Sequence, residues 1–541
     1  MLFLLDYGAG NVTSLANSLR QLGHDFRWIE HPSDFAQATS LVFPGVGAFE
    51  SAIQHLSRRG LLEPLREYLR SGRPYFGICI GMQVLFQSSE ESPSPGLGII
   101  PSPIQRFSDH DKAVPHIGWN SADLLDASPE ETGAFYYFVH SYCAKYSPEK
   151  YPEAAQWAHS TTQYGQELFI SSVCKGNIFG TQFHPEKSGD AGLALLDKWL
   201  RVPDAFHHAP ATPRATRVLS PKHGLTKRII ACMDVRANDA GDLVVTKGDQ
   251  YDVREKDPST AVASAGAVRN LGKPVALAAR YYAAGADELC LLNITSFRHS
   301  PLQDQPMLAV VRAAAERLFV PLTIGGGIKD TVDPDGTARS ALEVASAYFR
   351  AGADKVSIGS EAVYAVERLR AQGGVADGTS AIETIAHAYG RQAVVVSIDP
   401  RRVLVDVDYS GPYKDEVVRG ADGSAWWYQC TVSGGRESRP LSAVQLAQGV
   451  DVLGAGEILL NSIDRDGTGL GFDLDLLALV RGSVRIPVVA SSGAGKAAHF
   501  VEAFAQTGVE AALAAGIFHR QEVGIDEVKD ALHLAGIHVR R

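Results

Sequence analysis

Short apolar runs recur through the first 200 residues and predict buried strands. Between them lie segments with helical periodicity or turn residues, which is the pattern of a mostly parallel α/β layer structure. We therefore expect an α/β domain over residues 1–201, with strands at the runs LFLLDY, LVFPGVG, YFGICIG and NIFGTQFH.

This pattern stops at residue 202. Residues 202–226 are rich in Pro, Ala and Thr and have no apolar periodicity, so we interpret them as a linker. The His207-His208 pair within them fits a solvated linker better than a metal site.

Eight further apolar runs follow residue 227, and most are separated by segments long enough for a helix, such as SALEVASAYFRAGAD. Eight β/α units predict a closed (β/α)8 barrel over residues 227–541. The expected strands are RIIACMD, ELCLLNIT, PLTIGGG, KVSIGS, AVVVSID, EILLNSID, PVVASSG and AALAAGIF.

The barrel region also repeats itself. Its first four strand regions match the last four in the same order, which predicts two half-barrels with paired sites. The matches are IACMD with VVSID, GADELCLLNIT with GAGEILLNSID, VPLTIGGGIK with IPVVASSGAGK, and GADKVSIGS with GVEAALAAG. We expect surface loops at three turn-rich stretches, KDTVDPDGTARS, AQGGVADGTS and SGPYKDEVVRGADGSAWWYQCTVSGGRES.

Charge and cysteine usage exclude several classes of function. With 51 Lys plus Arg against 61 Asp plus Glu, the net charge of −10 gives no basic footprint for nucleic acid or anionic membrane. The six cysteines form no CxxC pair and no cluster at zinc spacing, so neither a disulfide framework nor a metal site is indicated. The opening MLFLLDYGAGN resembles a strand more than a targeting peptide, and we expect a cytoplasmic protein.

Candidate nucleophilic chemistry centres on Cys79, in the stretch PYFGICIGMQ. A Gly-x-Cys-x-Gly turn between a buried strand and a helix is a nucleophile elbow, and the helix N-terminus favours a thiolate. His184 and Glu186 in TQFHPEKSG supply a base and its orienting acid, and backbone N–H groups at Gly45 to Gly47 could form an oxyanion hole. The alternative is that Cys79 is a small buried hydrophobe. His140 in FVHSYC fits a core histidine equally well.

The motifs GICIGMQ and FHPEKS resemble those of the class I glutamine amidotransferases. DYGAGNVTSL and PGVGAF resemble the glutaminase part of the imidazole glycerol phosphate synthase family. The resemblance implies that Cys79, His184 and Glu186 release ammonia from glutamine through a thioester intermediate. It also implies glutamine contacts at Gly45, Gly47, Gln83, Ser141 and Tyr142.

Two aspartates follow equivalent strands of the barrel repeat, Asp234 on the first and Asp399 on the fifth. Active sites of this fold lie at the carboxyl ends of the strands, where two carboxylates can act as general acid and base. Each Asp could instead cap a loop or helix. Lys247, after the first strand, could bind substrate oxygens or be an ordinary surface charge.

Two equivalent clusters of small residues predict two phosphate sites, where backbone N–H groups can hold an anion. One glycine cluster alone is weak evidence, because glycines often only make tight turns. The first cluster contains Gly326, Gly327, Gly359 and Ser360, and the second contains Ser492, Gly493, Ala515 and Gly516.

KRIIACMDV, VVVSIDP, NSIDRDGTGLGFD and ASSGAGK resemble the cyclase part of the same family, and the whole chain resembles the fused bifunctional form of fungi and plants. The resemblance implies a reaction of ammonia with phosphoribulosyl-formimino aminoimidazole carboxamide ribotide. The products are imidazole glycerol phosphate, for histidine, and aminoimidazole carboxamide ribotide. It adds substrate contacts at Asn293, Asp466 and Gly467, and no cofactor. Asn293, where an Asp is expected, and Ser492 depart from the bacterial pattern. DRDGTG lacks the later ligands of a calcium loop.

Charged residues also begin four barrel strands, at Arg228, Glu288, Lys355 and Glu457. Such charges often only form stabilising salt bridges, but the repeat makes the two glutamates equivalent, so an inward-facing ring is expected. The resemblance implies that these four residues gate the entry of ammonia into the barrel. It also implies that Lys187 of the first domain faces Asp354 of the second domain of the same chain. We expect the chain to be a monomer.

Three other functions would account for part of these motifs. Pyridoxal phosphate synthases also join a glutaminase to a barrel, but their chemistry needs lysines where the strand ends here carry aspartates. A phosphosugar-binding regulator would not need both sets of reactive residues. The sister isomerase of histidine synthesis shares the half-barrel repeat but leaves the glutaminase motifs unexplained.

Overall fold

The structure is a computed structural model that describes residues 1–8, 10–45, 47–125, 134–203, 215–220, 224–237, 243–246, 274–294 and 306–541. The chain forms two compact units, the first from residues 1–226 with 387–392 and the second from 227–386 with 393–541. The predicted linker lies partly outside the described residues. Within its described part, Arg217 and Ser220 bond to side chains of the first unit.

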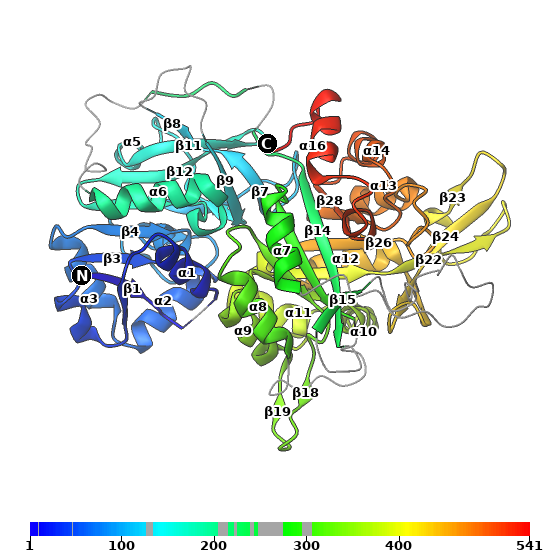
Figure 1. Cartoon of the computed structure of the whole chain (residues 1–541), viewed down its shortest axis with the longest axis horizontal. Helices are drawn as coiled ribbons and strands as arrows, with labels where there is room; N and C mark the ends of the chain where they lie inside the picture. The colour runs from blue at the N-terminus through cyan, green and yellow to red at the C-terminus, as the bar shows by residue number, and fades with distance from the viewer. Residues whose placement is uncertain are drawn as a thin grey trace, which may run out of the picture. The chain divides into compact units, whose positions relative to one another are not determined.

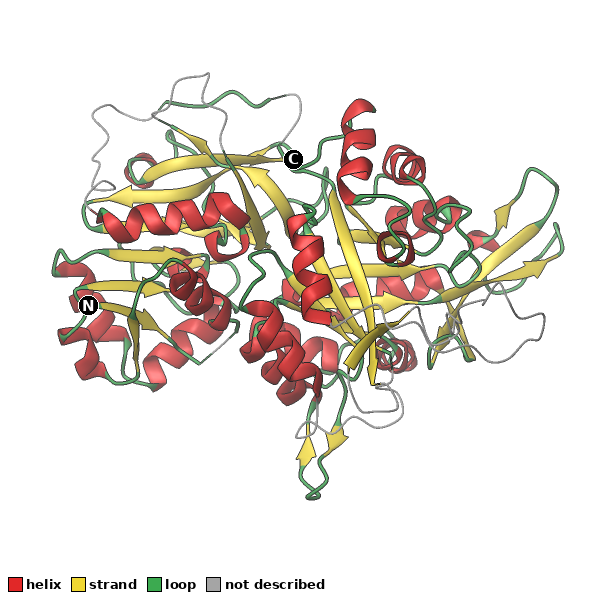
Figure 2. Ribbon diagram, viewed as in Figure 1, coloured by secondary structure: helices red, strands yellow, loops and turns green. Residues whose placement is uncertain are grey.

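One mixed sheet organises the first unit (Figures 1 and 2). Its central strands are parallel and, except for Ser40 at the start of β3, buried, as expected where helices cover both faces. Its order is β2 (Phe26–Ile29), β1 (Leu2–Leu5), β3 (Ser40–Phe43), β4 (Tyr75–Ile78), β13 (Ile178–Thr181), β12 (Glu167–Lys175), β11 (Ala158–Tyr164) and β8 (Asp123–Leu124). The four strands predicted in this region are confirmed as β1, β3, β4 and β13.

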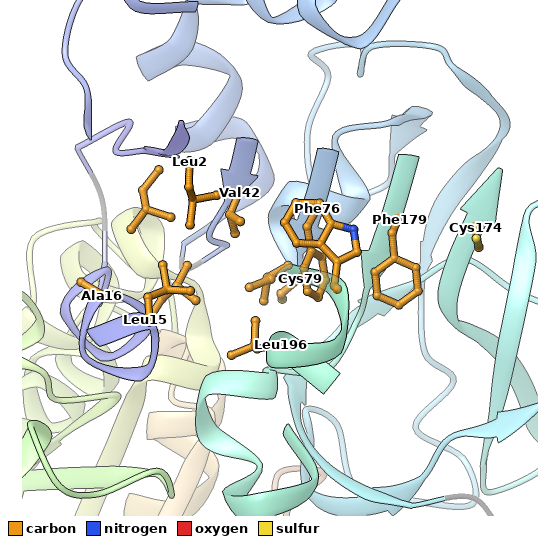
Figure 3. Packing of buried hydrophobic residues seen from close by; sticks show 13 residues of the cluster. Leu2, Leu15, Ala16, Val42, Phe76, Cys79, Cys174, Phe179 and Leu196 are labelled. Carbon is orange, nitrogen blue, oxygen red and sulfur yellow. The ribbon is translucent and has the colours of Figure 1, made fainter. Parts of the chain in front are cut away.

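Helices α1 (Thr13–Gln21) and α6 (Gly189–Arg201) pack on one face of this sheet, where Leu15 and Leu196 meet Val42 and Phe76 (Figure 3). Smaller sheets join β5 (Phe86–Ser89), β6 (Ile100–Arg106) and β10 (Tyr142–Cys143), and β7 (His116–Ser121) with β9 (Phe135–His140). The remaining helices are α2 (Phe49–Arg58), α3 (Leu62–Arg70), α4 (Ile80–Gln83) and α5 (Pro152–Ala155).

Eight parallel strands form a closed barrel in the second unit, because the last strand pairs with the first. The predicted (β/α)8 barrel and its eight strands are therefore confirmed. The strands are β14 (Arg228–Ala237), β16 (Glu288–Asn293), β17 (Leu322–Gly325), β20 (Lys355–Ile358), β21 (Val394–Ile398), β26 (Glu457–Asn461), β27 (Val488–Ser491) and β28 (Ala511–Ala514). A further strand, β15 (Leu243–Thr246), pairs antiparallel with β14.

Local sequence signals define the barrel helices. The helix predicted at SALEVASAYFRAGAD is α9 (Ala341–Ala351), which begins with a Ser340–Glu343 capping box and ends before Gly352 at φ +120°. The others are α7 (Pro274–Ala283), α8 (Pro306–Ala315), α10 (Ser360–Ala371), α11 (Ala381–Tyr389), α12 (Ala443–Leu453), α13 (Leu474–Ser483), α14 (Ala497–Thr507), α15 (Gly516–His519) and α16 (Ile525–Leu534).

Two of the three predicted surface loops contain strands instead. KDTVDPDGTARS forms a hairpin of β18 (Thr331–Val332) and β19 (Ala338–Arg339), which projects from the barrel in Figure 1. The long insertion contributes to an antiparallel sheet of β22 (Pro400–Val405), β23 (Val418–Arg419), β24 (Ala425–Val432) and β25 (Glu437–Ser442). The loop prediction was wrong there because AWWYQCTV is buried against neighbouring strands, despite its turn-rich flanks.

Alternation along the barrel strands defines an inner face. The interior cluster contains Ile230, Cys232, Val395 and Leu459, and side chains two residues apart on a strand share a face. Asp234, three residues before the end of β14, and Asp399, directly after β21, therefore continue the inward rows. None of the described helices is both long and apolar enough to cross a membrane.

Candidate functional site

Cys79 lies between β4 and α4 in a strained backbone conformation, with φ +49° and ψ −102°. Glycines make this turn possible. A Cβ on Gly77 would lie 2.3 Å from the carbonyl oxygen of Gly81, and a Cβ on Gly81 would lie 2.2 Å from that of Phe43. Positive φ at a non-glycine residue is typical of functional sites, and the geometry is that of a nucleophile elbow.

The loop after β3 packs directly against this elbow. A Cβ on Gly45 would lie 1.9 Å from the carbonyl oxygen of Ile78 and 2.2 Å from the nitrogen of Ile80. Only glycine permits this approach, which brings the backbone predicted to form the oxyanion hole beside Cys79. Gly47 has φ +142°, and Val46 lies outside the described residues.

His184 and Glu186 follow β13, the parallel neighbour of β4. His184 Nδ1 lies 2.7 Å from Glu186 Oε1. Burial alone would lower the pKa of His184, but the charges of Glu186 and Cys79 and hydrogen bonds to both raise it well above its usual value. The structure thus brings the predicted thiol, imidazole and carboxylate together.

Two side-chain amides, of Gln83 and Gln182, connect the carbonyl of Tyr142 to the thiol. Gln83 Nε2 lies 3.0 Å from both the Tyr142 carbonyl oxygen and Gln182 Oε1. Gln182 Nε2 in turn lies 3.4 Å from Cys79 Sγ. Ser141 Oγ is buried without a hydrogen-bond partner among the described residues. Gln182 was missed by the sequence analysis, although it stands in the quoted motif TQFHPEKSG.

Glu91 was also missed. Its Oε2 accepts the N–H of Phe49 at 2.9 Å, two residues after Gly47. Burial raises the pKa of Glu91 to about 7, against the lowering effect of that N–H. No sequence motif marks this carboxylate, because its importance comes from a contact across 42 residues.

His140 is a hydrogen-bonded core histidine. Its Nε2 lies 3.1 Å from His116 Nδ1, and its Nδ1 lies 2.8 Å from the Tyr142 carbonyl oxygen. Burial lowers the pKa of His140 to about 3; the Tyr142 carbonyl opposes this shift and His184 adds to it. Of the two open interpretations of this residue, the structure favours the core one.

At the barrel mouth, Asp399 is held by its neighbours on β21 and β26. Its Oδ1 accepts from Asn461 Nδ2 at 2.6 Å and from Ser397 Oγ at 3.2 Å. Burial raises the pKa of Asp399, while these two hydrogen bonds act in the opposite direction. Asn461 was missed because the repeat places Leu292 at the equivalent position.

Asp234 lies on β14 in register with Leu292 of β16. Asn293, the next residue of β16, pairs with Val235 and is partly exposed, as is Asp234. Because β14 and β21 are separated by three strands on either side of the barrel, the inward rows ending in Asp234 and Asp399 face each other across it. Lys247 lies outside the described residues.

The two predicted phosphate clusters have matching backbones. Gly326 and Gly327 have φ of +90° and +78°, and the equivalent Ser492 and Gly493 have φ of +70° and +94°. A Cβ on Gly493 would lie 2.3 Å from the carbonyl oxygen of Gly471, so this loop packs tightly on the one after β26.

The other members of the two phosphate clusters, and the predicted substrate contacts Asp466 and Gly467, lie at the same edge of the barrel. Gly359 precedes α10, whose first residue Ser360 accepts the N–H of Ser433 through its hydroxyl at 3.0 Å. Asp466 and Gly467 follow β26, and Ala515 and Gly516 follow β28. The structure therefore places every described member of the two clusters at the carboxyl ends of the strands.

At the opposite end of the barrel, the four predicted gate residues form a closed ring of ion pairs. Arg228 Nη1 lies 2.7 Å from Glu288 Oε2, and Arg228 also pairs with Glu457. Lys355 Nζ lies 2.6 Å from an oxygen of each glutamate. All four are buried. Burial opposes ionisation of Glu457, but the two cations lower its pKa to about 2.

Two family models match the chain. The model described as glutamine amidotransferase class-I covers residues 3–201. The model described as histidine biosynthesis protein covers residues 228–524. The first match spans the thiol site and the second spans both ends of the barrel.

Relatives match over nearly the whole length. Proteins named imidazole glycerol phosphate synthase hisHF from Emericella nidulans and Schizosaccharomyces pombe are each 52% identical over 99% of this chain, and over 98% and 99% of their own lengths. The chloroplastic protein of that name from Arabidopsis thaliana is 52% identical over 99% of this chain and 89% of its own.

Proposed function

Because the chain belongs to the imidazole glycerol phosphate synthase family of glutamine amidotransferase/cyclase enzymes, we propose that Cys79, His184 and Glu186 release the ammonia that the barrel consumes. The enzyme acts in histidine biosynthesis. The observation that carries the assignment of the glutaminase residues is the strained elbow at Cys79 beside an imidazole whose pKa Cys79 and Glu186 raise and whose hydrogen-bond partner is the buried carboxylate of Glu186.

In this mechanism the sulfur of Cys79 attacks the side-chain amide carbon of glutamine. The raised pKa of His184 keeps its imidazole protonated beside the thiolate, so His184 can give that proton to the departing nitrogen. Ammonia leaves and a thioester remains. His184 then takes a proton from water, whose oxygen breaks the thioester and releases glutamate, while backbone N–H groups near Gly45 and Gly47 stabilise the oxyanion.

The remaining polar groups of this site suit an amino-acid substrate. Glu91 accepts the N–H of Phe49, two residues after Gly47, and we propose that its carboxylate receives the α-ammonium group of glutamine. The hydroxyl of Ser141 supplies a hydrogen bond that no described residue uses. Gln83 and Tyr142 complete the glutamine site.

The barrel interior suits the passage of uncharged ammonia. Between the ring and the mouth, the inward rows carry apolar side chains, among them Ile230, Val395 and Leu459. A charged ammonium ion is costly to bury there, whereas neutral ammonia is not. We propose that the ring of Arg228, Glu288, Lys355 and Glu457 gates this passage.

We also propose that Lys187 pairs with Asp354 in cis and that the chain acts as a cytoplasmic monomer. Asp354 Oδ2 accepts the N–H of Leu322 at 2.8 Å.

At the barrel mouth, Asp234 and Asp399 act as general acid and base in the cyclisation. The two clusters around Gly326 and Gly493 hold the two phosphates through backbone N–H groups. Lys247, Asn293, Asp466 and Gly467 contact the remainder of phosphoribulosyl-formimino aminoimidazole carboxamide ribotide. The products are imidazole glycerol phosphate and aminoimidazole carboxamide ribotide.

The test is Cys79→Ala in the full chain. We expect glutamine-driven synthesis to fall by on the order of 10³-fold or more, since the nucleophile is removed, while ammonia-driven synthesis is retained. Product formation is measured with each nitrogen source, and amide-labelled glutamine shows whether the label enters an imidazole.

Cys174→Ala is the matched control, because Cys174 is a buried cysteine of the same core cluster (Figure 3). It should keep both activities. Loss of the ammonia-driven reaction in folded Cys79→Ala protein would contradict the separation of the two centres.

A further inference from the structure

Two buried histidines of the first unit, His116 and His140, take no part in the proposed bond-breaking steps. They lie in register across the antiparallel strands β7 and β9, with His116 Nδ1 3.1 Å from His140 Nε2. His116 is fully buried and His140 is 3% exposed. Polar groups at this depth need hydrogen-bond partners, so the contacts of each ring nitrogen determine where the protons lie.

Those contacts fix the tautomers of both rings. The carbonyl oxygen of Tyr142 can only accept, so His140 Nδ1 donates to it at 2.8 Å. In the neutral ring, His140 Nε2 then accepts from His116 Nδ1, and His116 Nε2 accepts from the amide of Asn120 at 3.1 Å. A second proton on either ring would place two donors face to face.

The Tyr142 carbonyl links the two histidines to the thiol through further hydrogen bonds. It accepts a second hydrogen bond from Gln83 Nε2, whose other contact is Gln182 Oε1. Because the oxygen of Gln182 faces Gln83, its nitrogen faces Cys79 Sγ at 3.4 Å. If the Gln182 amide were reversed, a lone pair would face the sulfur in place of an N–H group.

We propose that the His116–His140 pair is a positioning device for the nucleophile: by fixing the Tyr142 carbonyl and Gln83, it orients Gln182 so that an N–H group faces the sulfur of Cys79. This inference rests on the proposed glutaminase role of Cys79. An N–H group donated to the sulfur stabilises negative charge there. Gln182 and the pair therefore promote the attack on glutamine more than the binding of glutamine.

The first experiment replaces Gln182 itself. Gln182→Met keeps a similar length and removes the donor without adding charge. In the full chain we expect the kcat of glutamine hydrolysis to fall about 10-fold to 100-fold with KM changed less than about threefold. Alkylation of Cys79 by iodoacetamide at pH 7 should slow by about tenfold, and ammonia-driven synthesis should stay at the wild-type rate.

The second experiment changes Asn120, the residue of this hydrogen-bond network farthest from Cys79. Asn120→Asp replaces the donor to His116 Nε2 with an acceptor, which forces His116 to change tautomer or gain a proton. We expect glutamine hydrolysis to fall about tenfold in kcat. Asn177→Asp is the matched control, because the Asn177 amide donates to two backbone carbonyls outside this network. It should leave kcat unchanged.

The positioning role of the histidine pair and the glutaminase role of Cys79 can fail separately in these experiments. Wild-type alkylation and turnover in Gln182→Met would overturn the inference, even if Asn120→Asp failed to fold. Equal rates in folded Asn120→Asp and Asn177→Asp would show that the histidine pair serves stability alone and would also overturn it. Glutamine hydrolysis by Cys79→Ala would contradict the proposed function itself.

Discussion

The two half-barrels share a backbone but differ in the partners of their charged residues. Gly285 and Gly352 end helices of the first half with positive φ, as the equivalent Gly454 and Gly508 do in the second. Asp354 accepts the N–H at the start of β17, and the equivalent Glu510 accepts the N–H at the start of β27. Repetition has thus retained the contacts that the backbone requires.

At the base of the barrel, each half supplies one glutamate of the ring, but both cations come from the first half. The positions equivalent to Arg228 and Lys355 are Ala393 and Ala511 in the second half. Symmetric cations would have placed four positive charges against two negative ones in a buried site. Because the second half has alanines at these two positions, the ring has two positive and two negative charges and is neutral. A neutral set of ion pairs costs less free energy to bury than one with a net charge.

At the mouth, the two aspartates are likewise equivalent in sequence but have different neighbours. Asn461 donates to Asp399, whereas the equivalent residue in register with Asp234 is Leu292, whose side chain is aliphatic. The comparison teaches that the repeat supplies an equivalent pair of aspartates, while the side chains on the adjoining strands make their surroundings different.

The largest expected effect comes from removing either acid. Asp234→Asn and Asp399→Asn should each reduce ammonia-driven synthesis by on the order of 10²–10⁴-fold, because each removes one proton-transfer group. Glutamine hydrolysis in the other unit should persist in both variants. Product formation from ammonia and glutamate release are measured side by side. Near-normal synthesis by either variant would contradict the proposal that both halves of the barrel supply a proton-transfer group.

A smaller effect is expected on stability when the ring loses a negative charge. Glu457→Gln should lower the free energy of unfolding by about 3–5 kcal/mol, because Arg228 and Lys355 would then share one buried acid. Glu288→Gln should behave alike, since Glu288 also contacts both cations. Urea unfolding measures both. The double variant Lys355→Met with Glu457→Gln restores neutrality and should be less destabilised than Glu457→Gln alone.

The pH dependence of the same variant has a defined sign. The pKa of Glu457 is lowered from 4.5 to about 2 in the folded chain, so its stabilisation is fully present above about pH 4.5. It is lost as the pH falls through 2. The stability difference between wild type and Glu457→Gln should therefore narrow as the pH is lowered below 4.5. A constant difference would contradict the charge pairing described for the ring.

The smallest effect should follow from making the second half like the first. Asn461→Leu removes a hydrogen bond that lowers the pKa of Asp399, so that pKa should rise further. We expect ammonia-driven kcat to fall about tenfold or less, with the limb of its pH profile that Asp399 controls moved to higher pH: the acid limb if Asp399 is the base, the basic limb if it is the acid. Asn461→Gln retains the amide as a control. An unchanged profile would show that Asn461 does not distinguish the two halves.

Much of the candidate site could be predicted from short segments. The elbow at Cys79 is encoded by glycines within a few residues, and strand ends follow from apolar runs such as LFLLDY. The repeat alone indicated that Glu288 and Glu457 are equivalent. The long insertion was wrongly predicted as a loop, because the burial of AWWYQCTV depends on strands that pair with it from elsewhere in the chain.

The sequence by itself determined the two folds and marked Cys79, His184, Glu186 and the two aspartates as candidates, because these predictions rest on local periodicity, on short motifs and on the internal repeat. Only the tertiary structure decided which groups touch them. Gln182 meets Cys79 across 103 residues and Asn461 meets Asp399 across 62. Contacts at such separations leave no periodic signal, since they depend on how strands are ordered and which face each side chain occupies.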